Sequence, residues 1–194
     1  LGDESGQLRA EQALAEIIHI FGDYDDALTR LTDLQKRPAA RDPYVWLWLN
    51  CKRAAVMIDQ KRLSEAQTIL NEALPRFREL GDLRREAVVL ELQAVAAVEA
   101  GNETAALEKY CSCLERFRTL HFTDARERTL YNLRVWRRQT SSLQLQRQIR
   151  ALLLAEPEKR YVARFPRSLL LLLQILSVVA IPLTLLTWAI VLPD

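Results

Sequence analysis

The sequence has few residues that interrupt helices. Only 5 glycines and 7 prolines occur among 194 residues, whereas Ala, Leu, Glu, Gln and Arg are abundant. This composition favours helices throughout, so we expect an all-α fold. The opening residues LGDESGQ also lack the positive charge and the apolar stretch of a signal peptide.

Side chains that carry chemistry are scarce as well. His19 and His121 each stand alone, and Cys51, Cys111 and Cys113 do not have the spacing of a metal site. The sequence contains no phosphate-binding loop, no GxGxxG and no HExxH motif. We therefore expect no catalytic residue, no metal and no cofactor, and predict that the protein is not an enzyme. The cysteines indicate buried free thiols in a reducing compartment.

One long segment lacks charge altogether. Residues 168–192 read SLLLLLQILSVVAIPLTLLTWAIVL, which is 25 positions without an ionisable side chain. A helix of this length spans roughly 37 Å, and a bilayer core requires only about 20 residues. The run therefore predicts one C-terminal transmembrane helix that acts as an anchor.

The residues that flank this run predict its orientation. Basic side chains precede the run at Lys159, Arg160, Arg164 and Arg167, and only Asp194 follows it. Trp188 lies near the far end, where an amphipathic ring suits the membrane interface. Because cytoplasmic flanks carry the excess of Lys and Arg, we expect the N-terminal domain in the cytoplasm, or in an equivalent compartment such as a stroma. The C-terminus then lies across the membrane.

The charge of the chain is unevenly distributed. Residues 1–115 carry 14 Lys and Arg against 20 Asp and Glu, whereas residues 116–167 carry 13 against 4. The basic part lies next to the predicted anchor, where cationic side chains bind anionic lipid. We therefore expect membrane lipid as a partner of the basic linker and of residues 168–192, and we expect no nucleic acid.

Three segments align without gaps and indicate an internal repeat. They are GDYDDALTRLTDLQ from residue 22, KRLSEAQTILNEAL from residue 61 and GNETAALEKYCSCL from residue 101. Three sets of positions coincide: Ala27, Ala66 and Ala106; Leu31, Leu70 and Tyr110; Leu34, Ala73 and Cys113. Their spacing places all three positions of a segment on one face of a helix.

Each of these segments follows another helical stretch, at about residues 8–21, 43–60 and 83–100. Gly22 and Gly101 fall between the two helices of a pair, where a left-handed residue ends a helix most easily. The pattern is therefore helix, tight turn, helix, three times over.

Capping residues predict where some helices begin. Asp42 precedes a proline, which suits an N-cap with proline in the first turn. Ser64 and Gln67 have the spacing of a capping box, which predicts a helix that starts at residue 64. Thr123 and Asp124 are expected to cap a further helix in the same way.

These features resemble the tetratricopeptide repeat family. The run from Gly22 to Leu28 is similar to the start of that family's second helix, and the spacing from Gly101 to Ala106 repeats it. Residues 73–87 look like the join between two repeats. The resemblance implies a right-handed solenoid of about three helix pairs that binds other proteins in its groove. The period of about 40 departs from the family's 34, Lys61 replaces a glycine in the second turn, and a HEAT-like stack of helix pairs also fits this period.

The expected domains follow the chain in order. They are a flexible N-terminus (1–7), helical repeats (8–122, divided into 8–41, 42–81 and 82–122), a capping or basic amphipathic helix (123–156), a basic linker (157–167) and the transmembrane helix (168–192). A capping helix is expected because a solenoid must cover its last repeat.

One aromatic cluster is a candidate partner site. Tyr44, Trp46 and Trp48 alternate at the start of a predicted helix. Positions two apart cannot all face the core, so some aromatic surface is left for a partner. Packing against the neighbouring helix pair is the alternative explanation of the same residues.

We predict a membrane-anchored module that recruits or assembles partner proteins at the cytoplasmic membrane surface. The partner binds through the groove of the repeats or through the aromatic cluster. One alternative is an accessory subunit or assembly factor of a large membrane complex, respiratory or photosynthetic. A second alternative, suggested by Leu1 in place of an initiator methionine, is the anchoring part of a larger signalling or effector protein.

Overall fold

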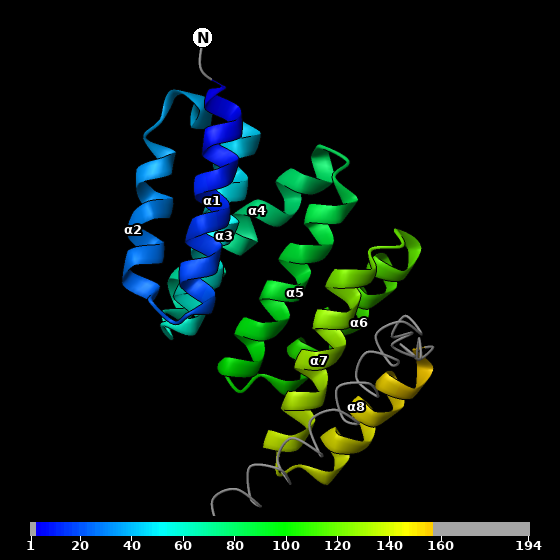
Figure 1. Ribbon diagram of the computed structural model, residues 1–194. Coiled ribbons are helices and arrows are strands. Elements are labelled where there is room, and N and C mark those ends of the chain that lie inside the picture. Colours follow the sequence, from blue (N-terminus) through cyan, green and yellow to red (C-terminus); the bar gives the residue numbers. More distant parts are fainter. Residues whose placement is uncertain (1–2, 157–194) are drawn as a thin grey trace, which may run out of the picture. The chain divides into compact units, whose positions relative to one another are not determined.

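The computed structural model describes residues 3–156, which form eight α-helices and one short 3₁₀ helix and contain no strand (Figure 1). The expected all-α fold is therefore confirmed for this part of the chain. The helices are α1 (Glu4–Ile20), α2 (Tyr24–Gln35), η1 (Pro38–Arg41), α3 (Pro43–Asp59), α4 (Leu63–Glu79), α5 (Leu83–Glu99), α6 (Glu103–Thr119), α7 (Thr123–Gln139) and α8 (Leu143–Ala155).

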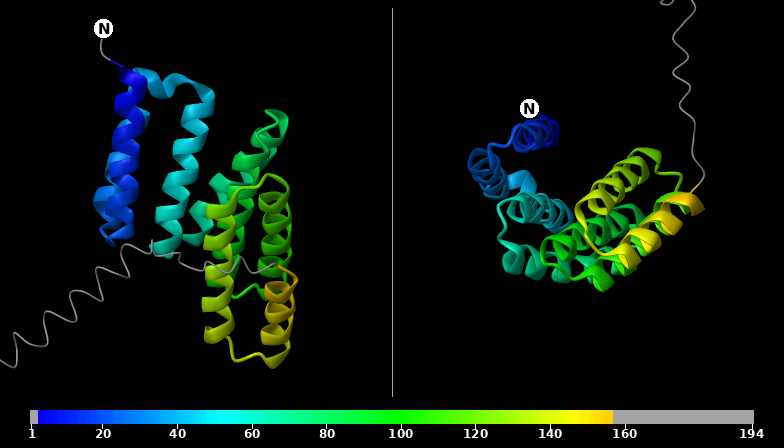
Figure 2. Two further views of the ribbon diagram at one scale, coloured as in Figure 1. Left: turned by 45° about the vertical axis from the view of Figure 1, so that its right-hand side comes forward. Right: turned by 90° about the horizontal axis from the view of Figure 1, so that it is seen from below.

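The helices from α3 onward follow a regular module. Each helix from α3 to α7 has 17 residues and a three-residue turn follows it, so successive helices begin at residues 43, 63, 83, 103, 123 and 143. Consecutive helices are antiparallel neighbours, and α1, α3, α5 and α7 also contact one another in order. Figure 2 shows the resulting curved double row of helices.

A left-handed residue follows α1 and each helix from α3 to α6. The middle residue of the turn has a positive φ at Gly22, Lys61, Gly81, Gly101 and His121. Around residue 81, the N–H of Gly81 donates to the carbonyl of residue 78 at 3.0 Å, and the next N–H donates to the carbonyl of residue 77 at 3.0 Å. This pair of bonds is the Schellman motif, which satisfies carbonyls that the helix leaves free. The expected turns at Gly22 and Gly101 are thus confirmed.

Only one of the predicted caps is correct. The carboxylate of Asp42 accepts hydrogen bonds from two backbone N–H groups in the first turn of α3, as expected. The predicted caps at Ser64 and at 123–124 are wrong, because Arg62 and Phe122 precede these helices and neither makes a side-chain cap bond. The Schellman turn sets where the next helix begins, so the chain is already helical at these polar residues.

The positions that coincide in the three aligned segments form part of the core, as their helical spacing predicts. All nine are at most 2% exposed: Ala27, Leu31, Leu34, Ala66, Leu70, Ala73, Ala106, Tyr110 and Cys113. Phe77 and Phe117 are also fully buried, and Phe77 packs edge-on against Tyr44 and Trp48. Burying each large apolar side chain contributes about 1.5–3 kcal/mol, so this interior carries much of the stability.

Two parts of the chain differ from the expected boundaries. α1 begins at Glu4, with the Asp3 carboxylate bonded to the N–H of Gly6 at 2.8 Å, although residues 1–7 were expected to be flexible. Residues 123–156, expected to form one capping helix, form α7 and α8. Both helices keep the 20-residue module, so they extend the row as a further antiparallel pair.

Candidate functional site

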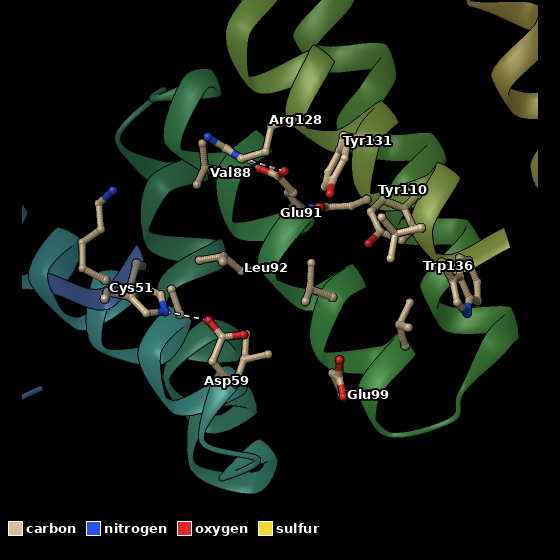
Figure 3. A pocket seen from close by; sticks show the side chains of 18 of the residues that line it. Cys51, Asp59, Val88, Glu91, Leu92, Glu99, Tyr110, Arg128, Tyr131 and Trp136 are labelled. Atoms are coloured by element: carbon tan, nitrogen blue, oxygen red, sulfur yellow. Dashed lines mark hydrogen bonds and ion pairs between the residues drawn. The ribbon is translucent and has the colours of Figure 1, made fainter. Parts of the chain in front are cut away.

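A broad hollow lies on the face formed by the odd-numbered helices. It has a volume of about 540 Å³ and receives side chains from α1, α3, α5 and α7, with Tyr110 of α6 at its base (Figure 3). No residue of α8 lines it. We call this hollow the groove.

The side chains that line the groove repeat at intervals of 40 residues. On each of α3, α5 and α7 they occupy positions i, i+4, i+7 and i+11, which form one helix face. The equivalent sets are Trp48, Val88 and Arg128; Lys52, Leu92 and Asn132; Ala55, Val95 and Val135; Asp59, Glu99 and Gln139. The three helices therefore present equivalent positions to the groove, but the side chains at these positions differ in charge and polarity from one helix to the next.

The middle of the groove is apolar. Val88, Leu92 and Val95 form one stripe along α5, and all three are only partly buried. Tyr131 of α7 adds an aromatic ring that is 63% exposed. Apolar side chains that remain accessible in a concave surface favour an apolar ligand, because binding removes their surface from water.

A buried ion pair joins α5 to α7 beside this stripe. The carboxylate of Glu91, which is 3% exposed, accepts a hydrogen bond from Arg128 Nε at 3.1 Å and a second from Arg128 Nη2. The hydroxyl of Thr129 donates a third at 2.9 Å. Hydrogen bonding to Glu91 raises the pKa of Arg128 despite partial burial. The ion pair between Glu91 and Arg128 thus joins α5 to α7 at the wall of the groove.

The far end of the groove carries paired charged side chains. His19 of α1 pairs with Asp59 of α3 at 2.6 Å, and Lys61 pairs with Glu99 of α5. Asp59 and Glu99 occupy equivalent positions, 11 residues or roughly 16 Å along their helices from Trp48 and Val88. The groove therefore has polar ends and an apolar middle.

The three aromatic residues predicted as a partner site do not stay together. The ring of Trp48 lines the groove, with Lys52 Nζ 4.7 Å and Arg85 Cζ 4.8 Å from its centroid. Tyr44 packs on the core, whereas Trp46 is half exposed and does not line the groove. The structure thus brings Tyr44 and Trp48 together on the side that faces α5 and separates Trp46 from them.

Tyr44 joins α3 to the start of α5. Its hydroxyl donates to the carboxylate of Asp82 and accepts a hydrogen bond from Arg85, which in turn binds Asp82 at 2.9 Å. Burial and the hydrogen bond to Asp82 raise the pKa of Tyr44. Burial alone would raise the pKa of Asp82, but its bonds to Tyr44 and Arg85 outweigh this and lower it. Both pKa shifts therefore arise from burial and hydrogen bonds at the contact between α3 and the start of α5.

The cysteines lie apart. Cys51 and Cys113 are buried as expected, but Cys111 is exposed, because residues two apart on a helix face different ways. Burial raises the pKa of Cys51 to about 12 and raises that of Cys113, so both are protonated, unreactive thiols at neutral pH. Residues 3–156 contain no cluster of three or more potential metal ligands.

The predicted membrane-interface residues lie outside the described part of the chain, as does the uncharged run 168–192. They are Lys159, Arg160, Arg164, Arg167 and Trp188. Within residues 3–156, no helix is both long and apolar enough to cross a bilayer.

Comparisons with protein-family models, with curated proteins and with solved structures find no match to this chain.

Proposed function

We propose that this protein is a membrane-anchored, non-enzymatic interaction module of the tetratricopeptide type, and that its groove binds partner proteins at the cytoplasmic membrane surface. Burial of the small residues Ala27, Ala66 and Ala106, and of the larger residues four positions later, supports the repeat assignment. The antiparallel helix pairs in a curved row support a right-handed solenoid of such pairs.

One observation carries the proposal. The groove combines an accessible apolar stripe on α5 with side chains from four helices that are not adjacent in the sequence. A solenoid uses such a concave surface to bind an extended segment or a helix. The partner we expect presents apolar side chains to Val88, Leu92 and Val95 and polar groups near Asp59 and Glu99.

The uncharged run provides the membrane attachment in this proposal. Residues 168–192 span the bilayer, and the basic residues that precede them keep the repeats on the cytoplasmic side. The lipid contacts of the basic linker at 157–167 add to this attachment. Partners captured in the groove are then concentrated near the membrane.

Site-specific crosslinking in native membranes tests the groove. A photoreactive phenylalanine analogue replaces Tyr131 in the groove or Leu80 outside it, since these residues are similarly exposed, at 63% and 58%. We expect a discrete crosslinked partner from position 131 and none from position 80. The L92E variant, which places a charge in the apolar stripe, is expected to abolish that product.

Folding must be checked separately, because Leu92 also contacts the core. Thermal unfolding of L92E by circular dichroism must remain cooperative for its result to count. Equal crosslinking from positions 80 and 131, or a product that survives in a folded L92E variant, would show that the groove does not bind the partner.

The outer face of α1 favours a second candidate, a subunit or assembly factor of a larger membrane complex. Leu14, Ile17 and Ile20 of this helix are exposed, as is Phe21, which directly follows it. Ile17 is equivalent to Val56 of α3, which is buried among residues of the first helix pair. A further protein surface is therefore expected to cover Ile17.

Solubilisation in mild detergent separates the two candidates. Stoichiometric membrane subunits that co-migrate with the wild-type protein and are lost in I17E, but not in the control L80E, would establish a subunit role. Migration as a monomer or small homo-oligomer, with partners captured only through position 131, supports the interaction module.

A further inference from the structure

The outward face of α8 differs in character from its packed face. Leu145 and Ile149 point into the core, and the helix contacts α6 and α7. The opposite face carries Leu143, Arg147, Arg150 and Leu154 at i, i+4, i+7 and i+11, and all four are exposed. We call these four residues the α8 stripe. It is roughly 16 Å long.

The two leucines of the stripe are among the most exposed apolar residues described, at 70% for Leu143 and 75% for Leu154. Scattered exposed leucines are common on protein surfaces. Here, however, they flank two cations, Arg147 and Arg150, on one helix face. Apolar side chains that enter the acyl boundary and arginines that reach the headgroups are typical of a helix lying in a membrane interface.

The arginines of the stripe have no acidic partner within residues 3–156. Arg147 and Arg150 form no ion pair with any described residue, whereas Arg116 and Arg128 both bind buried carboxylates on α5. The last two turns of α7 add Arg134, Arg137 and Arg138, which also lack an ion pair within residues 3–156. A concentration of uncompensated positive charge therefore lies in the last helix pair.

We propose that the α8 stripe binds the surface of an anionic bilayer. The inference rests on the proposed membrane location, and it adds a second attachment site within the folded domain. Two independent membrane contacts hold a protein far more firmly than one and restrict its orientation. Because no residue of α8 lines the groove, contact through this helix leaves the groove open.

Residues 1–156 are suited to the test. Residues 1–155 form one compact unit with its own hydrophobic core, so this fragment is expected to fold without the uncharged run. Co-sedimentation measures its binding to phosphatidylcholine vesicles with and without phosphatidylserine. We expect binding only to the anionic vesicles and weaker binding as salt is raised.

Charge variants test the arginines. R147Q/R150Q is expected to weaken binding about fivefold for each arginine, or about thirtyfold for the pair. The control is R9Q/R41Q, which removes the same charge from exposed arginines in α1 and η1 that form no ion pair within residues 3–156. An equal loss in both double variants would show a general charge effect and overturn the proposal.

Apolar variants distinguish a bilayer from other polyanions. L143S/L154S is expected to weaken vesicle binding, whereas I20S/F21S, which changes two equally exposed residues near the other end of the row, is not. Binding that survives L143S/L154S and is displaced by duplex DNA would show a polyanion site instead.

The fragment separates this inference from the proposed anchor. Because it lacks residues 157–194, its vesicle binding does not depend on the uncharged run. Carbonate extraction of the full-length protein from membranes reports on that run alone. Retention after extraction together with no vesicle binding by the fragment would leave the anchor intact and reject the α8 stripe.

Discussion

Replacing Arg128 by methionine tests how far the wall of the groove depends on its ion pair. The substitution keeps an unbranched stem but removes the charge that binds the buried carboxylate of Glu91. Removing one partner of a fully buried pair costs about 3–5 kcal/mol, and an exposed pair contributes at most about 1 kcal/mol. Arg128 is 55% exposed, but Glu91 is 3% exposed and keeps only the hydroxyl of Thr129. We therefore expect R128M to lower the free energy of unfolding by about 2–3 kcal/mol.

The double variant E91M/R128M should recover most of this loss. It removes both charges and leaves apolar side chains of similar volume, which is often neutral. The same chain contains a precedent one repeat earlier, because Cys51 and Val88 occupy the equivalent positions on α3 and α5. That pair of helices packs with no charge at these positions.

Urea unfolding of residues 1–156, followed by circular dichroism at neutral pH, measures these free energies. R9M serves as the control, since Arg9 is exposed and forms no ion pair with a described residue, and should change stability by less than about 0.5 kcal/mol. If R128M behaves like R9M, or if the double variant is as unstable as the sum of its single variants, then Glu91 is not the buried charge that this estimate assumes.

Two further predictions concern the turns. K61G should raise the free energy of unfolding by about 0.5–1 kcal/mol, because Lys61 has a φ of 63° that glycine adopts without strain. The control is K61A, which keeps the strained backbone and loses only an exposed ion pair. K61A should not raise the free energy of unfolding in the same urea titration. D82N should destabilise the domain by about 1–2 kcal/mol at pH 7. Because the pKa of Asp82 is lowered on folding, its contribution is complete above the ordinary value of 3.8 and is lost as pH falls through the folded pKa. The wild-type and D82N unfolding free energies should therefore converge as the pH falls below 3.8, and a constant difference would contradict the argument.

Most of the fold could be predicted because its signals are local. Ala66 and Leu70 lie one helical turn apart, and Gly101 marks a turn by its backbone freedom. Local signals fail where a neighbouring constraint is stronger. The helix after Arg62 starts before Ser64 because the turn through Lys61 has already set the backbone, and lysine gives no hint of a positive φ.

The groove could not be predicted from residue types, because its lining repeats in position along the helices and not in amino-acid type. Trp48, Val88 and Arg128 share no chemistry, yet they occupy the same place on three successive helices. Comparing positions 40 apart along the first helix of each pair would have found them. The ion pair between Glu91 and Arg128 links side chains 37 residues apart, which only the packing of α5 on α7 brings together.

Because the repeat is so regular, α7 could pack in a wrong register, and the ion pair between Glu91 and Arg128 disfavours that register. Since α3 and α5 present nearly the same backbone, α7 has two similar surfaces on which to pack. On α5, Arg128 meets the carboxylate of Glu91, whereas on α3 it would meet the thiol of Cys51 and leave Glu91 buried without a cation. The cost of that unpaired charge makes the wrong register unfavourable, even though the correct pair adds little stability over an apolar contact. We infer that α5 carries charge here because it must be distinguished from α3, which has Cys51 at the position equivalent to Glu91.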